Sequence, residues 1–332
     1  MGKEGYSLYW LANAAKIDVY ELWNILDEVR RGKLTYLEKQ IPKSGSGVRK
    51  LFVPPPILCR VQRALNKHVL NDLSLSPGVF GFSGGSIVDA IIPHLESGVM
   101  LSFDIVNAFG NTTNHRVLNS LIGNRNIFYE NGELIHEYGP FSWYVAHILT
   151  DLTTWRGVLP QGAPTSPRLF DKAFEPIDES ILRLLHTYTE KEGTKKKGIV
   201  AKVTRYADNF AISLQNTNYF PPKLRRHILE AVRAYGYNYH EDSIRHMQNG
   251  KATRMLGLNI INRHISAPRG FKRNIRLTLH HLRYFLDHNL PVEEIWLRLR
   301  GQMAFGRLGE LPDSLINTYI SLEEEIEELY GV

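Results

Sequence analysis

The sequence predicts an α+β fold with more than one subdomain. Apolar residues recur at helical spacing in two N-terminal stretches, 8–31 and 57–70, and again at 269–288. At 203–213, two apolar runs flank a short polar stretch, which is typical of a β-hairpin. A chain of 332 residues exceeds one ordinary globular core, so we expect two or three packed subdomains.

The first third of the chain alternates helical and extended segments. A Gly/Ser turn joins two short extended runs within 41–56, and three prolines end the second run. A glycine-rich stretch at 76–87 has no regular periodicity, and the spacing at 88–96 is compatible with a helix. The apolar run of "GVMLSFD" then predicts a buried strand that carries Asp104 at its end.

From residue 120 onward, the predicted elements alternate with loops. The segment 120–150 mixes turns and helix without clear periodicity. Prolines in "GVLPQGAPTSPRLFDKAF" predict a loop that opens into a helix at about Pro167 or Arg168. The elements expected after it are the hairpin at 203–213, a helix at 222–235 and a strand pair near 255–265.

Composition indicates a folded protein that is compatible with nucleic acid. Hydrophobic residues make up 43% and charged residues 22% of the chain, which excludes the disordered class. The formal net charge of +6, from 40 basic and 34 acidic residues, favours a polyanionic partner only where the positive charges cluster. The lone cysteine, Cys59, excludes an internal disulfide framework and predicts a cytoplasmic location. No apolar run is long enough for a membrane helix, so we expect no membrane partner.

Two aspartates carry the first functional signal. Asp104 ends an apolar strand and Asp208 lies in the polar tip of the 203–213 hairpin, where an isolated carboxylate is costly to desolvate. Each has a structural alternative: Asp104 could cap the next turn, and the Asp208–Asn209 pair could supply the positive φ of a tight turn. The proline-rich "LPQGAPTSP" lies between them in the sequence, and the three features together favour one active site.

These three stretches resemble the motifs of a known family. "SFDIVNAF" (102–109), "LPQGAPTSP" (159–167) and "YADN" (206–209) are similar, in content and order, to the palm motifs of reverse transcriptases. Upstream, "GVRKLFVPPPILCRVQRAL" and "GFSGGSIVDAIIPH" resemble the fingers motifs of the bacterial branch that includes group II intron, retron and phage-defence enzymes. Downstream, "MLGLNI" (255–260) resembles a primer grip and "LRGQMAFGR" (299–307) a thumb segment.

The resemblance implies a right-hand polymerase fold, with fingers, an antiparallel-sheet palm and a short helical thumb. The implied division is an N-terminal helical extension at 1–40, fingers at 41–103, a palm at 104–268 and a thumb at 269–332, with part of the fingers contributed by about 120–158. The implied activity is that of an RNA-directed DNA polymerase, a nucleotidyltransferase. The expected partners are an RNA template, a DNA or RNA primer and deoxynucleoside triphosphates, with a non-coding RNA or a protein as further candidates.

The resemblance also implies roles at the reaction centre. Two Mg²⁺ ions, with Mn²⁺ as an alternative, would be held by the carboxylates of Asp104 and Asp208 and by the backbone carbonyl of Ile105, because hard cations prefer oxygen ligands. Phe109 falls where the family keeps a ring beneath the sugar, which would exclude a 2′-hydroxyl. The alternative for Phe109 is a core phenylalanine on the same turn.

The same motifs imply nucleotide and nucleic-acid contacts. Gln161 and Gly162 would line the nucleotide pocket, where glycine allows close backbone approach. Arg49 and Lys50 follow the fingers turn and could neutralise the triphosphate, with a solvated hairpin tip as the alternative. The basic side of the helix at 269–288 could track phosphates or could simply be solvated. The candidate primer and template contacts are Leu256, Gly257, Lys272, Arg273, Arg276 and Arg283.

Several positions depart from the family pattern. Most relatives have a second aspartate at the hairpin tip where this chain has Asn209, an amide that contributes no charge to bound cations. Asn209 and Tyr206 are therefore accessory candidates. Ser243 stands where many relatives have a lysine proposed to protonate pyrophosphate, with Arg245 or His246 as alternative substitutes. "SIVDAIIPH" and "MLG" also differ from the motifs usual in retron enzymes, which favours a compact stand-alone, defence-associated type.

Three functional hypotheses follow. The first is templated synthesis of DNA on RNA, with a role in anti-phage defence. The second keeps the fold but makes the enzyme a template-independent or protein-primed DNA polymerase in a defence complex. The third is a catalytically silent nucleic-acid-binding subunit. The joint presence of Asp104, Gln161 and Asp208 favours an active enzyme.

Overall fold

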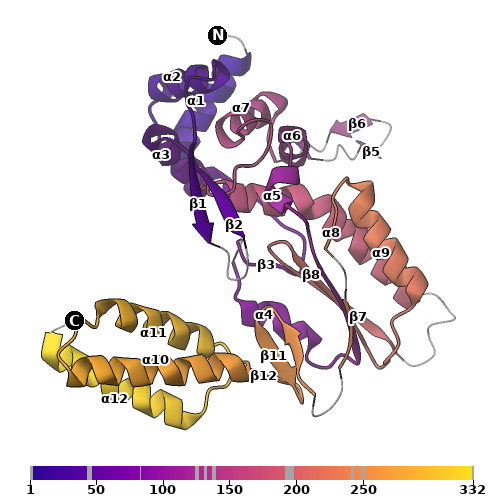
Figure 1. Cartoon of the computed structure of the whole chain (residues 1–332). Helices are drawn as coiled ribbons and strands as arrows, with labels where there is room; N and C mark the ends of the chain where they lie inside the picture. The colour runs from indigo at the N-terminus through magenta and orange to yellow at the C-terminus, as the bar shows by residue number, and fades with distance from the viewer. Residues whose placement is uncertain are drawn as a thin grey trace.

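The chain folds into N-terminal helices, a central sheet covered by helices, and a C-terminal helical bundle (Figure 1). The computed structural model describes residues 3–42, 47–82, 84–123, 127–130, 133–136, 140–190, 198–240, 243–247 and 251–330. The N-terminal helices and the C-terminal bundle lie at opposite ends of the molecule. This mixture of helices and strands confirms the predicted α+β class.

The N-terminal stretch of helical spacing contains a break. α1 (Lys3–Ala15) and α2 (Val19–Arg30) are separated at Lys16, whose φ of 57° lies outside the helical region. Asp18 caps α2, because its carboxylate accepts hydrogen bonds from two backbone N–H groups of the first turn. The spacing at 8–31 therefore covers two helices, and the capping aspartate marks the boundary.

A hairpin and several helices precede and flank the sheet. The extended runs predicted within 41–56 do form an antiparallel hairpin, but its first strand begins earlier, at Leu37. The segment 120–150 contains a further antiparallel hairpin and the start of a helix. The elements are β1 (Leu37–Pro42), β2 (Val48–Val53), α3 (Pro56–Leu65), η1 (Asn66–Leu70), α5 (Ala108–Asn111), α6 (Asn114–Ile122), β5 (Ile127–Glu130), β6 (Glu133–His136) and α7 (Trp143–Thr153).

The central sheet is largely antiparallel. Among the described residues its strand order is β3-β7-β8-β4-β9. The strands are β3 (Val79–Phe80), β4 (Val99–Asp104), β7 (Val200–Tyr206), β8 (Asn209–Gln215) and β9 (Ser243–His246). β4 is antiparallel to β8 and β9, β7 is antiparallel to β8, and the short β3 runs parallel to β7. The strand that ends at Asp104 thus lies beside the predicted hairpin.

Helices cover one face of this sheet. Along β4, Leu101 and Phe103 join the main hydrophobic core together with residues of α8 and α9. Because side chains alternate along a strand, Ser102 and Asp104 point to the opposite face. The covering helices are α8 (Ser166–Glu190) and α9 (Pro222–Ala234), and both start within two residues of the predicted positions. The predicted catalytic carboxylate therefore lies away from the main core.

A smaller sheet packs on the opposite face. Leu258 and Ile260 of this sheet form a second core with Ile91, Met100 and Ala211. The sheet extends the predicted strand pair near 255–265 by a further antiparallel strand. The helix expected at 88–96 is shorter and ends in a 3₁₀ turn. The elements are α4 (Ile87–Ile91), η2 (Ile92–His94), β10 (Thr253–Met255), β11 (Leu258–Ile261) and β12 (His264–Ser266).

The C-terminal bundle has a core of its own, to which Ile275, Leu282 and Leu299 belong. Its helices are α10 (Arg269–Asp287), α11 (Glu293–Gly306) and α12 (Asp313–Tyr330). The bundle is seated on the smaller sheet, because Phe305 packs against that sheet's core and the N–H of Glu310 donates a 3.0 Å hydrogen bond to β12. No helix in the described part of the chain is both long and apolar enough to cross a membrane.

Candidate active site at the end of the central sheet

The two predicted carboxylates lie at the same end of neighbouring strands. Asp104 ends β4 and pairs in register with Asn209, the first residue of β8, so Asp208 directly precedes that partner. The N–H of Ile105 also donates a hydrogen bond of 3.0 Å to the backbone carbonyl of Asp208. The fold thus brings together two acids that are far apart in the sequence.

The turn that carries Asp208 is a two-residue loop. Tyr206 and Asn209 pair across the hairpin, which leaves Ala207 and Asp208 as the loop residues. The positive φ falls on Ala207, at 54°, so its expected placement on the Asp208–Asn209 pair was wrong. A left-handed backbone costs a non-glycine residue about 1–2 kcal/mol. Such conformations persist where neighbouring contacts hold them, and they often occur at functional sites.

Burial and mutual repulsion act on the carboxylate of Asp104. Burial raises its pKa above the ordinary value, and the negative charge of Asp208 raises this pKa further. The nearby His240 and Arg245 oppose the shift. The charged form of Asp104 is therefore disfavoured at this position, and a bound divalent cation would remove that penalty.

Asn209 supports the neighbouring carboxylate. Its side-chain amide nitrogen donates a hydrogen bond of 3.1 Å to Oδ1 of Asp208. An aspartate here would present an acceptor and a negative charge instead of a donor. The departure from the family pattern thus replaces a repulsive neighbour with a hydrogen-bond partner for Asp208.

The donor set suits a hard divalent cation. Asp104 and Asp208 offer carboxylate oxygens. Ile105 lies opposite Tyr239 in an antiparallel bridge whose hydrogen bonds are made by the residues on either side of the pair. The backbone N–H and carbonyl of Ile105 therefore point away from Tyr239, toward the hairpin. Within the described ranges, no group of three or more His, Cys, Asp or Glu side chains could hold a metal. These residues therefore fit a cation whose remaining ligands are substrate oxygens and water, as is usual for phosphate-bound Mg²⁺.

A cavity of about 250 Å³ adjoins Asp104. It is lined by Asp104, Tyr206 and Asn209 from the central sheet and by the turn between β10 and β11. Leu256 and Gly257 in that turn both have positive φ, 49° and 86°, as a tight two-residue hairpin loop requires. The predicted primer-grip turn thus lines the same cavity as the predicted catalytic residue Asp104.

Two basic residues, Arg245 and His240, lie near Asp104. Arg245 of β9 lines the cavity, donates a hydrogen bond to a backbone carbonyl of β10 and lowers the pKa of Asp104. His240 acts on Asp104 in the same direction, and its N–H donates a 2.8 Å hydrogen bond to the Asp104 carbonyl. Of the alternatives for the family's lysine, Arg245 is placed at the site, whereas the side chains of Ser243 and His246 lie outside the described residues. His240 was not among the predicted site residues.

Gln161 and Gly162 lie against the β2 strand. The carbonyl of Gln161 accepts a hydrogen bond of 2.7 Å from the N–H of Phe52. Gly162 has a φ of 113°, and a Cβ there would come within 3.4 Å of Leu51 and Phe52. Glycine is favoured here by the positive φ, because contacts of 3.4 Å with β2 are close to ordinary van der Waals distance.

Arg49 and Lys50 lie on the exposed β1–β2 hairpin. Lys50 forms a 2.9 Å ion pair with Glu38 across the hairpin, so its charge is partly compensated. Arg49 is exposed and has no carboxylate partner among the residues that the structure describes. Of the two predicted triphosphate contacts, Arg49 has the more available charge.

Phe109 belongs to an aromatic cluster at the edge of the main core. Its half-buried ring lies 5.7 Å from the ring of Phe82 and 5.0 Å from that of Phe170, centroid to centroid. The contact with Phe170 ties it to the core, and the remaining exposure leaves one side free. Both explanations for this residue, a core phenylalanine and a ring beneath the sugar, agree with this position.

The predicted contacts on α10 differ in how far their charges are compensated. Arg283 pairs with Asp287 at 2.9 Å and with Glu325 at 2.5 Å, and both carboxylates help to raise its pKa. Lys272 donates a 3.0 Å hydrogen bond to a serine of β12. The predicted contacts that are exposed, with no carboxylate partner among the described residues, are Arg273 and Arg276.

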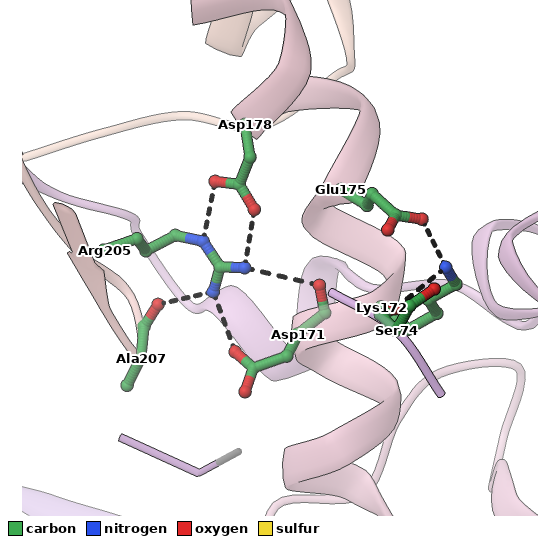
Figure 2. Close-up of polar contacts among 7 residues, drawn as sticks. All are labelled: Ser74, Asp171, Lys172, Glu175, Asp178, Arg205 and Ala207. Atoms are coloured by element: carbon green, nitrogen blue, oxygen red, sulfur yellow. Dashed lines mark hydrogen bonds and ion pairs between the residues drawn. The ribbon is translucent and has the colours of Figure 1, made fainter. Parts of the chain in front are cut away.

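A buried ionic cluster beneath the hairpin was missed by sequence reasoning. Arg205 of β7 is 1% exposed and pairs with Asp171 at 2.8 Å and Asp178 at 2.7 Å, both on α8 (Figure 2). Its desolvation is offset by these carboxylates. The available signal was an arginine on the core-facing side of a buried strand, but the sequence does not show which acids meet it.

A second buried network joins η2 to both strands of the hairpin. The ring nitrogens of the fully buried His94 lie 2.6 Å from the Ser213 hydroxyl and 2.8 Å from that of Thr204. Ser97 donates to Ser213, and Thr204 donates to the carbonyl of Ala90, so every group is satisfied when Nε2 carries the proton. Burial lowers the pKa of His94 to about 4, which makes the ring neutral at pH 7.

Comparisons with known proteins agree with these features. Residues 41–260 match the family described as reverse transcriptase (RNA-dependent DNA polymerase). The retron Ec86 reverse transcriptase of Escherichia coli is 23% identical over 328 residues, which cover 98% of this chain and 91% of that protein. The retron Mx65 reverse transcriptase of Myxococcus xanthus is 26% identical over 249 residues, or 74% of this chain and 55% of that protein. The solved apo telomerase from Candida tropicalis superimposes with a TM-score of 0.49 at 12% identity, covering 92% of this chain and 64% of the other.

The family match covers well over half of the chain and includes Asp104 and Asp208, the two predicted catalytic carboxylates. The curated relatives named above are retron enzymes, so the chain is similar to compact bacterial reverse transcriptases of the retron type, although its "SIVDAIIPH" and "MLG" motifs differ from the usual retron pattern. The predicted right-hand fold and nucleotidyltransferase activity are those of this family. The chain belongs to the reverse transcriptase family of RNA-directed DNA polymerases.

Proposed function

We propose that this enzyme extends a primer at the end of the central sheet, with two divalent metal ions held by Asp104 and Asp208. When bound, Mg²⁺ ions at such a site neutralise the charge that develops on the phosphates and activate the attacking hydroxyl. The carbonyl of Ile105, whose backbone faces the hairpin, would complete the protein's share of the ligands. Mn²⁺ is an alternative because it also accepts carboxylate and carbonyl oxygens.

The observation that carries this proposal is the pairing of the two acids beside the cavity. The pKa of Asp104 is raised by desolvation and by the negative charge of Asp208, and a divalent cation bound beside the pair would stabilise the charged carboxylates. The cavity next to it is closed by the turn of Leu256 and Gly257, where a primer end would lie. Arg49 on the β1–β2 hairpin would meet the triphosphate.

The proposed nucleic-acid partners rest on the family match and on exposed arginines of the C-terminal bundle. We propose that the exposed Arg273 and Arg276 on α10 contact the phosphates of the primer–template duplex. We also propose a non-coding RNA as a further partner of this chain, in addition to the RNA template. Sequencing the nucleic acid that co-purifies with the protein tests this, and recovery of unrelated cellular RNA alone would contradict it.

Incorporation of labelled deoxynucleotides on a primed RNA homopolymer tests the activity and the site. Asp104→Asn and Asp208→Asn are expected to reduce incorporation on the order of 10³-fold or more, the scale seen when reacting groups are removed. Asp151→Asn removes only an exposed ion pair with Arg30 and should retain the wild-type rate.

The same assay separates the alternatives. Product that forms equally well without template would identify a template-independent or protein-primed polymerase. Absence of product with every divalent metal tried would identify a silent binding subunit. A role in anti-phage defence is also proposed: phage plating on cells with the wild-type or the Asp208→Asn protein tests it, and equal plating would exclude a role that needs synthesis.

A further inference from the structure

The ionic cluster around Arg205 lies directly beneath the turn that carries Asp208. Nε and Nη2 of Arg205 form a fork with the two carboxylate oxygens of Asp178, at 2.9 and 2.7 Å (Figure 2). Nη1 donates to Oδ1 of Asp171 at 2.8 Å, and Nη2 donates to the backbone carbonyl of Asp171 at 3.3 Å. Both acids belong to α8, so the arginine is clamped to the helix that covers the core face of the sheet.

The remaining N–H of the guanidinium reaches the turn itself. Nη1 donates a hydrogen bond of 3.0 Å to the carbonyl oxygen of Ala207, as Figure 2 shows. With this bond, each of the five N–H groups of Arg205 has an acceptor, which leaves the planar group one orientation. Three phenylalanine rings surround it, with their centroids 5.3 to 5.9 Å from the guanidinium carbon. The guanidinium is thus a rigid link between α8 and Ala207.

The backbone of the turn is held at several points. The N–H of Ala207 donates to Phe80 of β3 at 3.3 Å, and the carbonyl of Asp208 accepts from Ile105 at 3.0 Å. These bonds are between main-chain groups and remain when side chains are changed. The bond from Arg205 to the Ala207 carbonyl is made by a side chain, and it acts on the peptide that joins Ala207 to Asp208.

We propose that Arg205 is a positioning residue for the polymerase reaction. It transmits the fixed position of α8 to the Ala207–Asp208 peptide and so sets the direction in which Asp208 presents its carboxylate beside Asp104. This inference rests on the metal-binding role proposed for Asp208. Lysine would keep the positive charge, but its ammonium group lacks the fork that serves two carboxylates and the turn at once.

Arg168 provides a matched control. Arg168 is also buried and lies on α8, the helix that carries Asp171 and Asp178. Its guanidinium donates hydrogen bonds to backbone carbonyls of the 70–73 segment. It has no described hydrogen bond to the hairpin. Arg168→Lys and Arg205→Lys both remove buried guanidinium hydrogen bonds, and only Arg205→Lys removes a hydrogen bond to the turn that carries Asp208.

The test measures primer extension by the purified full-length chain as Mg²⁺ is titrated, at a temperature where each variant is folded by circular dichroism. Arg205→Lys is expected to raise the Mg²⁺ concentration for half-maximal rate about tenfold and to lower the maximal rate, with the KM for deoxynucleotide unchanged. Arg168→Lys should keep the wild-type Mg²⁺ dependence even where its Tm falls equally. Equal Mg²⁺ dependence in the two variants would overturn the inference.

Two further variants keep the outcome unambiguous. If Arg205→Lys does not fold, Asp178→Asn loosens the clamp while leaving the Asp171 and Ala207 contacts. It should shift the Mg²⁺ dependence in the same direction by a smaller factor, and no shift would overturn the inference. Asp208→Asn checks the proposed function separately, because activity in that variant would refute the metal site whatever Arg205 does.

Discussion

At the residue scale, replacing the side-chain amide of Asn209 by a carboxylate changes the charge of the proposed metal site while nearly preserving its shape. Its amide donates to the Asp208 carboxylate, so Asn209→Asp replaces a hydrogen bond with repulsion. We expect the metal-free protein to lose about 1.5–3 kcal/mol of stability, the scale of a hydrogen bond to a charged group. Added Mg²⁺ should then raise the Tm more than in the wild type, because binding stabilises the folded state. Differential scanning calorimetry with and without Mg²⁺ measures this.

Asn119→Asp, on an exposed position of α6, adds the same charge away from the site and serves as the control for Asn209→Asp. A smaller Mg²⁺ response in Asn209→Asp than in wild type would contradict the role assigned to the amide.

Because of His94, the free energy of unfolding is expected to fall at acid pH. Its pKa is depressed from 6.5 in the unfolded chain to about 4 in the fold, so the unfolded state binds the proton more tightly. Stability is therefore fully present above pH 6.5 and is lost as the pH falls toward 4. At 1.36 kcal/mol per pH unit, the loss reaches about 3 kcal/mol. Urea unfolding at neutral and acid pH checks this.

His94→Gln removes the titrating group, so its stability should change less between neutral and acid pH than that of the wild type. The exposed His281→Gln should retain the wild-type pH dependence. If His94→Gln and wild type lose stability in parallel, another group is responsible.

At the scale of the element, the β10–β11 turn depends on glycine. Gly257 has a φ of 86°, and a Cβ there would lie 3.2 Å from Cζ of Phe305 in α11. Gly257→Ala should cost about 1–2 kcal/mol for the left-handed backbone alone. It should also weaken primer use, because the turn borders the cavity beside Asp104. Chemical denaturation and extension at limiting primer measure the two effects.

Gly301→Ala in the middle of α11 is the matched change, since a Cβ there meets nothing within 4 Å. It should stabilise the protein by about 0.5–1 kcal/mol. Wild-type primer affinity in Gly257→Ala would show that the turn has no part in holding the primer.

We predict that α10 binds the primer–template through those arginines whose charges are not paired with a carboxylate. Arg273→Ala and Arg276→Ala should each reduce the slope of log affinity for primer–template against log salt by about 0.7–0.9. Arg283→Ala should leave that slope nearly unchanged, because its guanidinium is paired with Asp287 and Glu325. Binding titrations over a range of salt concentrations measure the slopes, and an equal reduction in all three would contradict the assignment.

Elements with strong local signals were predictable from the sequence. The helix at 222–235 and the hairpin at 203–213 were recognised because periodicity and turn residues are local properties. The position of the positive φ was not, because Ala207 adopts it under a contact from β3 and one from Arg205, whose guanidinium is held by α8. The hairpin β5–β6 was missed because the sequence of 120–150 lacks clear alternation.

At the scale of the whole molecule, motifs identified Asp104 and Asp208, but not the groups that hold them. Sequence motifs point to the side chains that are expected to act on substrate. The register of β4 and β8 then brings Asp104 and Asp208 together. The partners of Arg205 depend on how α8 docks on the sheet, which no local pattern encodes. The compensation of Lys50 and Arg283 by nearby acids is likewise a property of the packed structure.

The strand order of the central sheet has a consequence for how the enzyme moves. β4 and β8 are inner strands, paired on both sides, whereas β9 lies at an edge of the described sheet. Amide hydrogens of β4 and β8 should therefore exchange with deuterium only through global unfolding, and those of β9 through smaller openings. Exchange followed by mass spectrometry would show this as two separate rates. A movement of the β1–β2 hairpin or of the C-terminal bundle would then leave β4 and β8, and with them the pairing that holds Asp104 beside the hairpin turn, unchanged.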